Sequence, residues 1–138
     1  MIEPLGLDPT DRVLLVSAPA AAFVIELARR LERGVVVGLG GADEIAPLRR
    51  ATRDLVNVMF QPGSADEIPW ADGFFSVVVD LKGGWRDPRG AAREVARVLA
   101  PGGRAYLAQV EAARLVEAGL RSAGVRGELL VFEKPRAR

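Results

Sequence analysis

The 138-residue chain contains neither cysteine nor histidine. Without cysteine there is no disulfide and no thiolate nucleophile, and without both residue types there is no zinc site of the Cys/His kind. Histidine is also the commonest general base at neutral pH, so acid–base chemistry would fall to carboxylates, Lys82, Lys134 or Tyr106. We therefore expect no metal centre and no catalysis that depends on cysteine or histidine.

Charge of one sign is not in excess either, because 19 basic residues balance 18 acidic ones and leave a net charge of +1. No overall field would draw such a protein to nucleic acid or to an anionic membrane. No hydrophobic run reaches the roughly 20 residues that a membrane span needs. Residues 1–4 have neither the basic nor the apolar region of a signal peptide. We therefore expect a cytoplasmic protein with no nucleic-acid or membrane partner.

The composition is that of an ordinary globular protein, with 49% hydrophobic and 27% charged residues. The chain is long enough for one domain with a hydrophobic core, over residues 1–138. Short β-branched runs alternate with segments of helical period along the whole chain. We expect strands over residues 12–17, 35–37, 56–60, 74–81, 104–110 and 128–133, and helices over 20–33, from 43 onward, 88–99 and 111–123. Such alternation predicts an α/β fold of the doubly wound, Rossmann-like type, with a mostly parallel sheet between two layers of helices.

Local signals set the expected helix ends. Gly34 stands where a C-terminal glycine cap of the first helix is expected, and Asp43 is a plausible N-cap of the second. Pro47 would be tolerated there only within the first turn. Pro88 opens the third helix, and Gly124 is expected to end the fourth.

Two motifs carry a family resemblance. Residues 94–104 read EVARVLAPGGR, and residues 68–75 read IPWADGFF. Both are similar to segments of the class I S-adenosylmethionine (SAM)-dependent methyltransferases, and the resemblance extends in register over nearly the whole chain. It implies the strand order 3-2-1-4-5, with one antiparallel C-terminal strand beside strand five. The 94–104 motif joins a helix to strand five in that family, so its role is architectural.

The positions that bind the cofactor in that family hold other residues here. The glycine-rich turn after strand one aligns with Ser17 to Ala21, where Pro19 and neighbouring side chains replace glycines that let the backbone approach a ligand. The acid that grips the ribose aligns with Gly40, and the adenine-side Asp aligns with Ser64, followed by Ala65. The resemblance therefore implies that SAM binding is lost and that no cofactor is bound.

Three further residues are candidate ligand contacts. Asp80 stands near the carboxyl end of strand four, where open α/β sheets place ligands, and Lys82 follows it two residues later. This pair forms either a small polar site or, as the favoured interpretation, a surface ion pair or a loop-capping carboxylate. Trp85 lies in the next loop and is a candidate for a ligand or partner contact, whereas Trp70 is expected to pack in the core.

Two parts of the resembling family are expected to be missing. Strand one begins at about residue 12, so the helices that would close over the cofactor have no counterpart. Residues 125–127 leave little room for the first arm of the C-terminal hairpin. The final strand would then be an exposed edge, which proteins normally cover or pair. We expect a homodimer or a partner protein, bound through this edge or the uncapped cleft.

Three functions remain open. The first is a methyltransferase-like domain without SAM binding or catalysis that acts as a binding or assembly module. The second is a divergent SAM-dependent methyltransferase, which acts either alone or with a partner chain that completes it. The third is a domain that binds another small ligand in the same cleft through Ser17, Ser64, Asp80 and Trp85.

Overall fold

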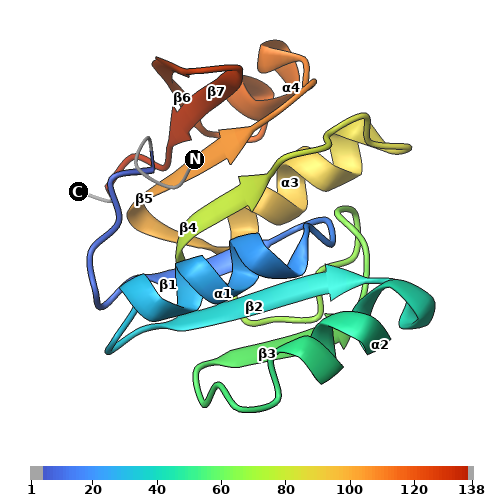
Figure 1. The fold of residues 1–138 in the computed structure, drawn as a ribbon. Helices are drawn as coiled ribbons and strands as arrows, with labels where there is room; N and C mark the ends of the chain where they lie inside the picture. Colours follow the sequence, from blue (N-terminus) through green and yellow to red (C-terminus); the bar gives the residue numbers. More distant parts are fainter. Residues whose placement is uncertain (1–4, 137–138) are drawn as a thin grey trace.

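The computed structural model describes residues 5–136, so residues 1–4 and the end of the expected tail at 137–138 lie outside it. The strands are β1 (Arg12–Leu15), β2 (Val35–Gly40), β3 (Val58–Pro62), β4 (Phe75–Asp80), β5 (Leu99–Leu107), β6 (Arg121–Arg126) and β7 (Leu129–Glu133), and the helices are α1 (Ala21–Arg30), α2 (Ala42–Ala51), α3 (Pro88–Val98) and α4 (Ala112–Glu117). All seven strands form one sheet in the order β3-β2-β1-β4-β5-β7-β6 (Figure 1).

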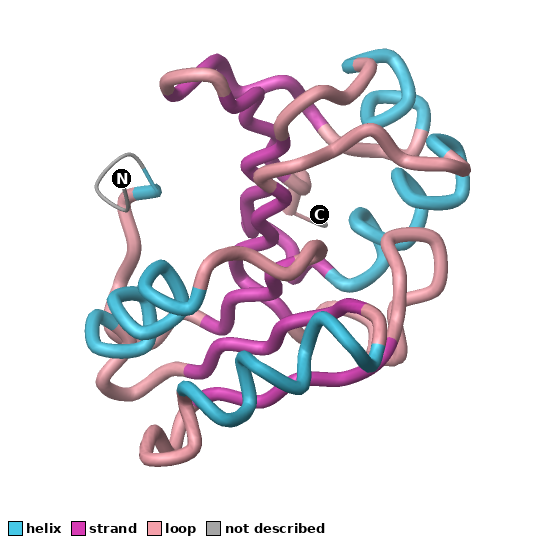
Figure 2. The backbone as a smooth tube through the Cα atoms, turned by 45° about the vertical axis from the view of Figure 1, so that its right-hand side comes forward, coloured by secondary structure: helices cyan, strands magenta, loops and turns pink. Residues whose placement is uncertain are grey.

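The middle of the sheet is parallel and buried on both faces. β1 pairs in parallel with β2 and β4, and the apolar run at Val13–Leu15 is fully covered. On one face the core includes side chains of α1 and α2, and on the other it includes those of α3 and α4. The helices stand on both sides of the edge-on sheet (Figure 2). The expected three-layer fold and the order 3-2-1-4-5 are confirmed. Within residues 5–136, no helix is long and apolar enough to cross a membrane.

The C-terminal hairpin is complete, which corrects the expectation that its first arm is missing. β6 pairs antiparallel with β7, and β7 pairs antiparallel with β5. The final strand β7 therefore lies inside the sheet, and two antiparallel strands follow β5 instead of one. The exposed edges of the sheet are β3 and β6.

The expected helix over 111–123 is wrong because it ends at Glu117. Gly119 has φ 103°, and its N–H donates to the carbonyl of Val116, while the N–H of Leu120 donates to the carbonyl of Leu115. This bonding pattern is a Schellman motif, in which a residue in the left-handed conformation stops a helix. The end signal was therefore Gly119 and not Gly124, and the residues in between became strand β6.

Other boundaries also differ. The N-cap of α2 is Gly41 and not Asp43, so Pro47 lies beyond the first helical turn. Gly34 is not a C-cap: a Cβ atom on it would lie 2.1 Å from the carbonyl oxygen of Asp11, so glycine permits a close approach of two segments. β5 begins at Leu99, earlier than expected, because the Pro-Gly-Gly turn forms a bulge inside the strand.

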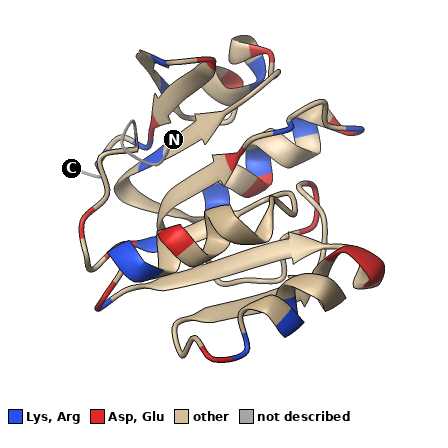
Figure 3. Ribbon diagram, in the orientation of Figure 1, with Lys and Arg blue, Asp and Glu red and all other residues tan. Residues whose placement is uncertain are grey.

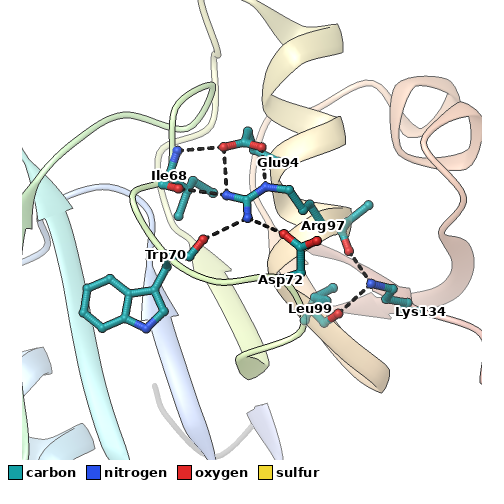
Figure 4. Close-up of polar contacts among 8 residues, drawn as sticks. Ile68, Trp70, Asp72, Glu94, Arg97, Leu99 and Lys134 are labelled. Atoms are coloured by element: carbon teal, nitrogen blue, oxygen red, sulfur yellow. Dashed lines mark hydrogen bonds and ion pairs between the residues drawn. The ribbon is translucent and has the colours of Figure 1, made fainter.

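The 94–104 motif has an architectural role in the structure. The Arg97 guanidinium donates to both carboxylate oxygens of Glu94, to the carbonyls of Ile68 and Trp70, and to Asp72 (Figure 4). Glu94 also accepts from the backbone N–H of Ile68. One helical turn of α3 thereby holds the loop that leads into β4. The pKa of Glu94 is lowered, chiefly by the hydrogen bond from Arg97.

The end of α3 is bound from the other side of the motif. The Lys134 ammonium donates to the carbonyls of Ala96 and Leu99 at 2.8 and 2.7 Å (Figure 4). Ala96 is in the last turn of α3, where carbonyls lack partners within the helix, and Leu99 is its C-cap. Trp70 packs against Phe74 and Phe75, with ring centroids 5.9 and 5.8 Å away, which confirms its expected role in the core.

Candidate functional site

Asp80 is the centre of the polar structure at the carboxyl end of β4. It is 2% exposed and accepts four hydrogen bonds. The Ser17 hydroxyl and the backbone N–H groups of Lys82 and Gly83 donate to Oδ1, at 2.8, 3.0 and 3.0 Å. The indole N–H of Trp85 donates to Oδ2 at 2.7 Å. A buried carboxylate with this many donors organises the loop that surrounds it.

The loop-capping interpretation of Asp80 is therefore confirmed. The contact between Asp80 and Lys82 is made by the backbone of Lys82, and the structure places no ion pair between their side chains among the described residues. Lys82 itself is exposed. The two residues do not form the small polar site that their spacing allowed.

Glycines fix the shape of the loop between β4 and α3. Gly83 and Gly84 have φ values of 62° and 60°, in the left-handed region that favours glycine. A Cβ atom on Gly83 would lie 1.7 Å from the carbonyl oxygen of Ala108, and the N–H of Gly84 donates to the carbonyl of Gln109. Gln109 has φ 49° and is the only non-glycine residue at positive φ in the described part of the chain. The loops after β4 and β5 thus lie in direct contact.

The turn between β1 and α1 offers few side-chain donors to a ligand. Ser17 gives its hydroxyl to Asp80, and Pro19 has no N–H. Ala20 is the N-cap of α1 and provides no side-chain hydrogen bond. A side chain at the end of β2 would also be crowded, because a Cβ atom on Gly40 would lie 3.2 Å from Ile45 Cγ2.

Glu44 was not identified from the sequence. Its Oε1 atom accepts from the N–H of Gly41 at 2.9 Å and caps α2. The same oxygen lies 3.4 Å from the position that a Cβ atom on Gly40 would take. A carboxylate therefore stands at the end of β2 although the β2 residue there is glycine. Glu44 stands three residues after Gly41, where a glutamate can accept from the N-cap N–H, and this spacing was the available signal.

Ser64, Ala65 and Trp85 line one hollow of about 260 Å³, between the loops that follow β3 and β4. The Ser64 hydroxyl donates to Asp66 at 2.6 Å, and this bond is the largest cause of the lowered pKa of Asp66. The structure thus groups the candidates in two sets, Ser17 with Asp80 and Ser64 with Ala65. Trp85 donates to Asp80 and lines the same hollow as Ser64 and Ala65. Pro19 and Gly40 do not line this hollow. Among residues 5–136, no group of three or more acidic side chains is placed to hold a metal ion.

These features define a Rossmann-like, mostly parallel sheet with a polar centre at Asp80, at the carboxyl end of β4. Residues 16–107, more than half of the chain, match the model of the methyltransferase domain family. The chain belongs to this family.

Known relatives agree with this assignment. The chain is 36% identical over 109 residues to a demethylmenaquinone methyltransferase from Mycolicibacterium vanbaalenii, over 74% of this chain and 43% of that protein. It is 38% identical over 60 residues to the Escherichia coli protein YafE, over 42% of this chain and 29% of that protein. It spans less than half the length of these curated relatives. The crystal structure of the [4+2]-cyclase SpnF has the same fold, with a TM-score of 0.82, 17% identity and coverage of 99% of this chain and 78% of that chain.

Proposed function

We propose that this methyltransferase-family domain has lost SAM binding and catalysis and acts as a binding or assembly module. The observation that supports this proposal most directly is the hydrogen bond between Ser17 and Asp80. In open parallel sheets, ligands bind beyond the carboxyl ends of the strands where the strand order reverses, which here is between β1 and β4. At this point the two strand ends are bridged by their own side chains.

The residues present fit SAM poorly. Pro19 has no N–H for a ligand, and Gly40 supplies no carboxylate for a ribose. The Ser64 hydroxyl, at the adenine-side position, already donates to Asp66. Asp80 is buried and fully engaged. No reaction step through SAM is therefore assigned to this chain.

A divergent methyltransferase is the second candidate, and Glu44 is the observation that favours it. Its carboxylate lies beside the position from which a side chain at Gly40 would project. A carboxylate accepting two hydroxyls is a strong, charge-assisted contact. Under this candidate, Glu44 supplies at the end of β2 the acid that Gly40 lacks.

Titration with SAM and S-adenosylhomocysteine, by isothermal calorimetry, separates the two candidates. Each lost hydrogen bond to a charged group costs roughly 1.5–3 kcal/mol, so two lost anchors weaken binding about a hundred-fold to ten-thousand-fold. We expect dissociation constants well above ~100 μM. The variant Gly40→Asp should not restore binding, because Pro19 remains and Ile45 crowds the new side chain.

A dissociation constant at or below ~100 μM for either molecule would overturn the proposal. If Glu44→Gln then weakened that binding at least about tenfold, SAM binding through Glu44 would be supported and the divergent methyltransferase favoured instead. Glu117→Gln is the matched control, since Glu117 is an exposed carboxylate on α4 that does not touch this edge.

For the assembly role we propose the β3 edge, since β7 is internal. The N–H of Val36 donates to the carbonyl of Asn57, and the N–H of Gly63 donates to that of Gly40. Odd-numbered residues of this segment therefore face β2, and Val58 and Phe60 direct their backbone groups outward. The outward carbonyl of Phe60 accepts from Arg49, which leaves three outward groups at Val58 and Phe60 for a second strand.

The two edges differ in their protection. β6 carries an arginine at each end and a register shift between Ser122 and Val125, both of which discourage pairing. β3 has no charged residue and includes Met59, which is 48% exposed; Val56, which is 102% exposed, lies two residues before the strand. These features favour a second copy of the chain, or a partner protein, at β3.

We expect the purified protein to dimerise at high concentration and Met59→Lys to weaken the dimer at least about tenfold, or 1.4 kcal/mol. A lysine on an edge strand opposes strand addition. Light scattering over a concentration series measures the effect. Val125→Lys on β6 is the control and should leave the dimer unchanged. A strict monomer that also captures no partner protein, or an equal effect of both variants, would contradict assembly through β3.

A further inference from the structure

A second hollow, of about 140 Å³, is also lined by Trp85 but not by Ser64. It is bounded by the loop from β4 to α3, the start of α3, the loop after β5 and α4. Its volume is well below the roughly 300–1,000 Å³ of pockets for drug-sized ligands and equals about five water molecules. Only a small molecule fits.

The walls of this hollow are held rigidly. The indole of Trp85 is fixed by the hydrogen bond to buried Asp80. Gly84 and Gln109 are joined by a backbone hydrogen bond, and Gln109 is held in the left-handed region. Non-glycine residues in such conformations are sparsely populated and cluster at ligand sites. The sequence therefore maintains an unfavourable backbone conformation at a position that lines this hollow.

The residues that line this hollow are of two kinds, apolar and charged. Trp85, Pro88 and Val110 supply apolar surface. Glu111 and Arg114 supply opposite charges within one helical turn, because the N–H of Arg114 donates to the carbonyl of Glu111. Acidic and basic segments lie together at α4 (Figure 3). An apolar wall opposite a pair of opposite charges is complementary to a small molecule with an ammonium, a carboxylate and an apolar group.

We propose that this hollow binds a small zwitterion of the α-amino-acid class, with Arg114 on the carboxylate, Glu111 on the ammonium and the side chain against Trp85. This site uses different loops from the β1–β4 edge. The proposal therefore goes beyond the loss of SAM binding and does not depend on the SAM titration.

The test is a titration followed by the NMR signal of the Trp85 indole N–H, with L-valine as the probe. The chain has two tryptophans, and Trp70, which packs against Phe74 and Phe75, is an internal control. We expect a saturable shift of the Trp85 signal alone. Isobutylamine, which lacks the carboxylate, and 3-methylbutanoate, which lacks the ammonium, should each bind at least about tenfold more weakly.

Two charge-removing variants test which side chain binds which charged group of the ligand. Arg114→Gln should weaken L-valine at least about tenfold and leave isobutylamine unchanged. Glu111→Gln should weaken L-valine similarly and leave 3-methylbutanoate unchanged. Glu117 forms an ion pair with Arg114 at 3.8 Å, so the control is a carboxylate elsewhere. Glu32→Gln, at an exposed position in the loop between α1 and β2, should change neither. The proposal is overturned by the absence of a saturable shift up to about 50 mM L-valine, by equal binding of the amine, or by full affinity in Arg114→Gln.

Discussion

Replacing Arg97 by alanine is expected to lower the free energy of unfolding by about 3 kcal/mol, and the midpoint of thermal unfolding by roughly 10 °C. The guanidinium makes five hydrogen bonds, three of them to Glu94 and Ile68. Its removal takes two donors from the carboxylate of Glu94 and one donor from each of two loop carbonyls. The contact with Asp72 adds little, because that carboxylate is 81% exposed. Thermal and urea unfolding measure the loss.

Two other variants test whether geometry or charge explains this effect. Arg97→Lys keeps the charge but loses the planar fork, so it should lose more than half of the same stability. Arg93→Ala, an exposed arginine one turn earlier on α3, should stay within about 0.5 kcal/mol of the wild type. If Arg97→Lys were as stable as the wild type, the hydrogen-bond geometry in Figure 4 would not matter.

The stability difference between wild type and Arg97→Ala should depend on pH. The hydrogen bond from Arg97 lowers the folded-state pKa of Glu94, so the contribution is fully present above the unfolded pKa of about 4.3. It is lost as the pH falls through the lowered folded value. Unfolding measured from neutral pH to about pH 3 should therefore show the two curves converging at the acid end. Curves that stay parallel would contradict the role of Glu94.

Replacing Asp80 by asparagine should lower the free energy of unfolding by about 2–3 kcal/mol. The amide oxygen can still accept from Ser17 and the two backbone N–H groups. Its NH₂ group then faces the indole N–H of Trp85, where Asp80 Oδ2 now accepts at 2.7 Å. Two donors that face each other in a buried place leave both unsatisfied. A shift in tryptophan fluorescence should accompany the loss of stability.

A double-mutant cycle tests this cause. Phenylalanine at position 85 has no N–H, so Asp80→Asn should cost about 1 kcal/mol less in the Trp85→Phe background than in the wild type. Trp70→Phe is the matched background and should leave the cost of Asp80→Asn unchanged, since Trp70 packs elsewhere. If Asp80→Asn cost the same free energy of unfolding in all three backgrounds, the hydrogen bond from Trp85 would not be the cause of the lost stability.

The arrangement at the carboxyl edge of the sheet could be expected only in part from the sequence. Pro19, Gly40 and Ser64 predict by residue type that the family's usual cofactor anchors are replaced. The sequence does not show what replaces them, because Ser17 and Asp80 are 63 residues apart and meet only across two paired strands. The position of the Glu44 carboxylate could not be predicted for the same reason, since it reaches the end of β2 from the next helix.

The sequence by itself determined the two kinds of element and their layers, because β-branched runs, helical period and Pro-Gly turns act over a few residues. The order of the parallel strands and the role of the 94–104 motif came from the resemblance to a known family. The tertiary structure decided the conformation of the C-terminal segment that forms β6. Residues 121–126 are exposed and carry no strong strand pattern, so their conformation depends on the Gly119 helix stop and on pairing with β7. Strand pairing is a contact between segments, and a local pattern does not contain it.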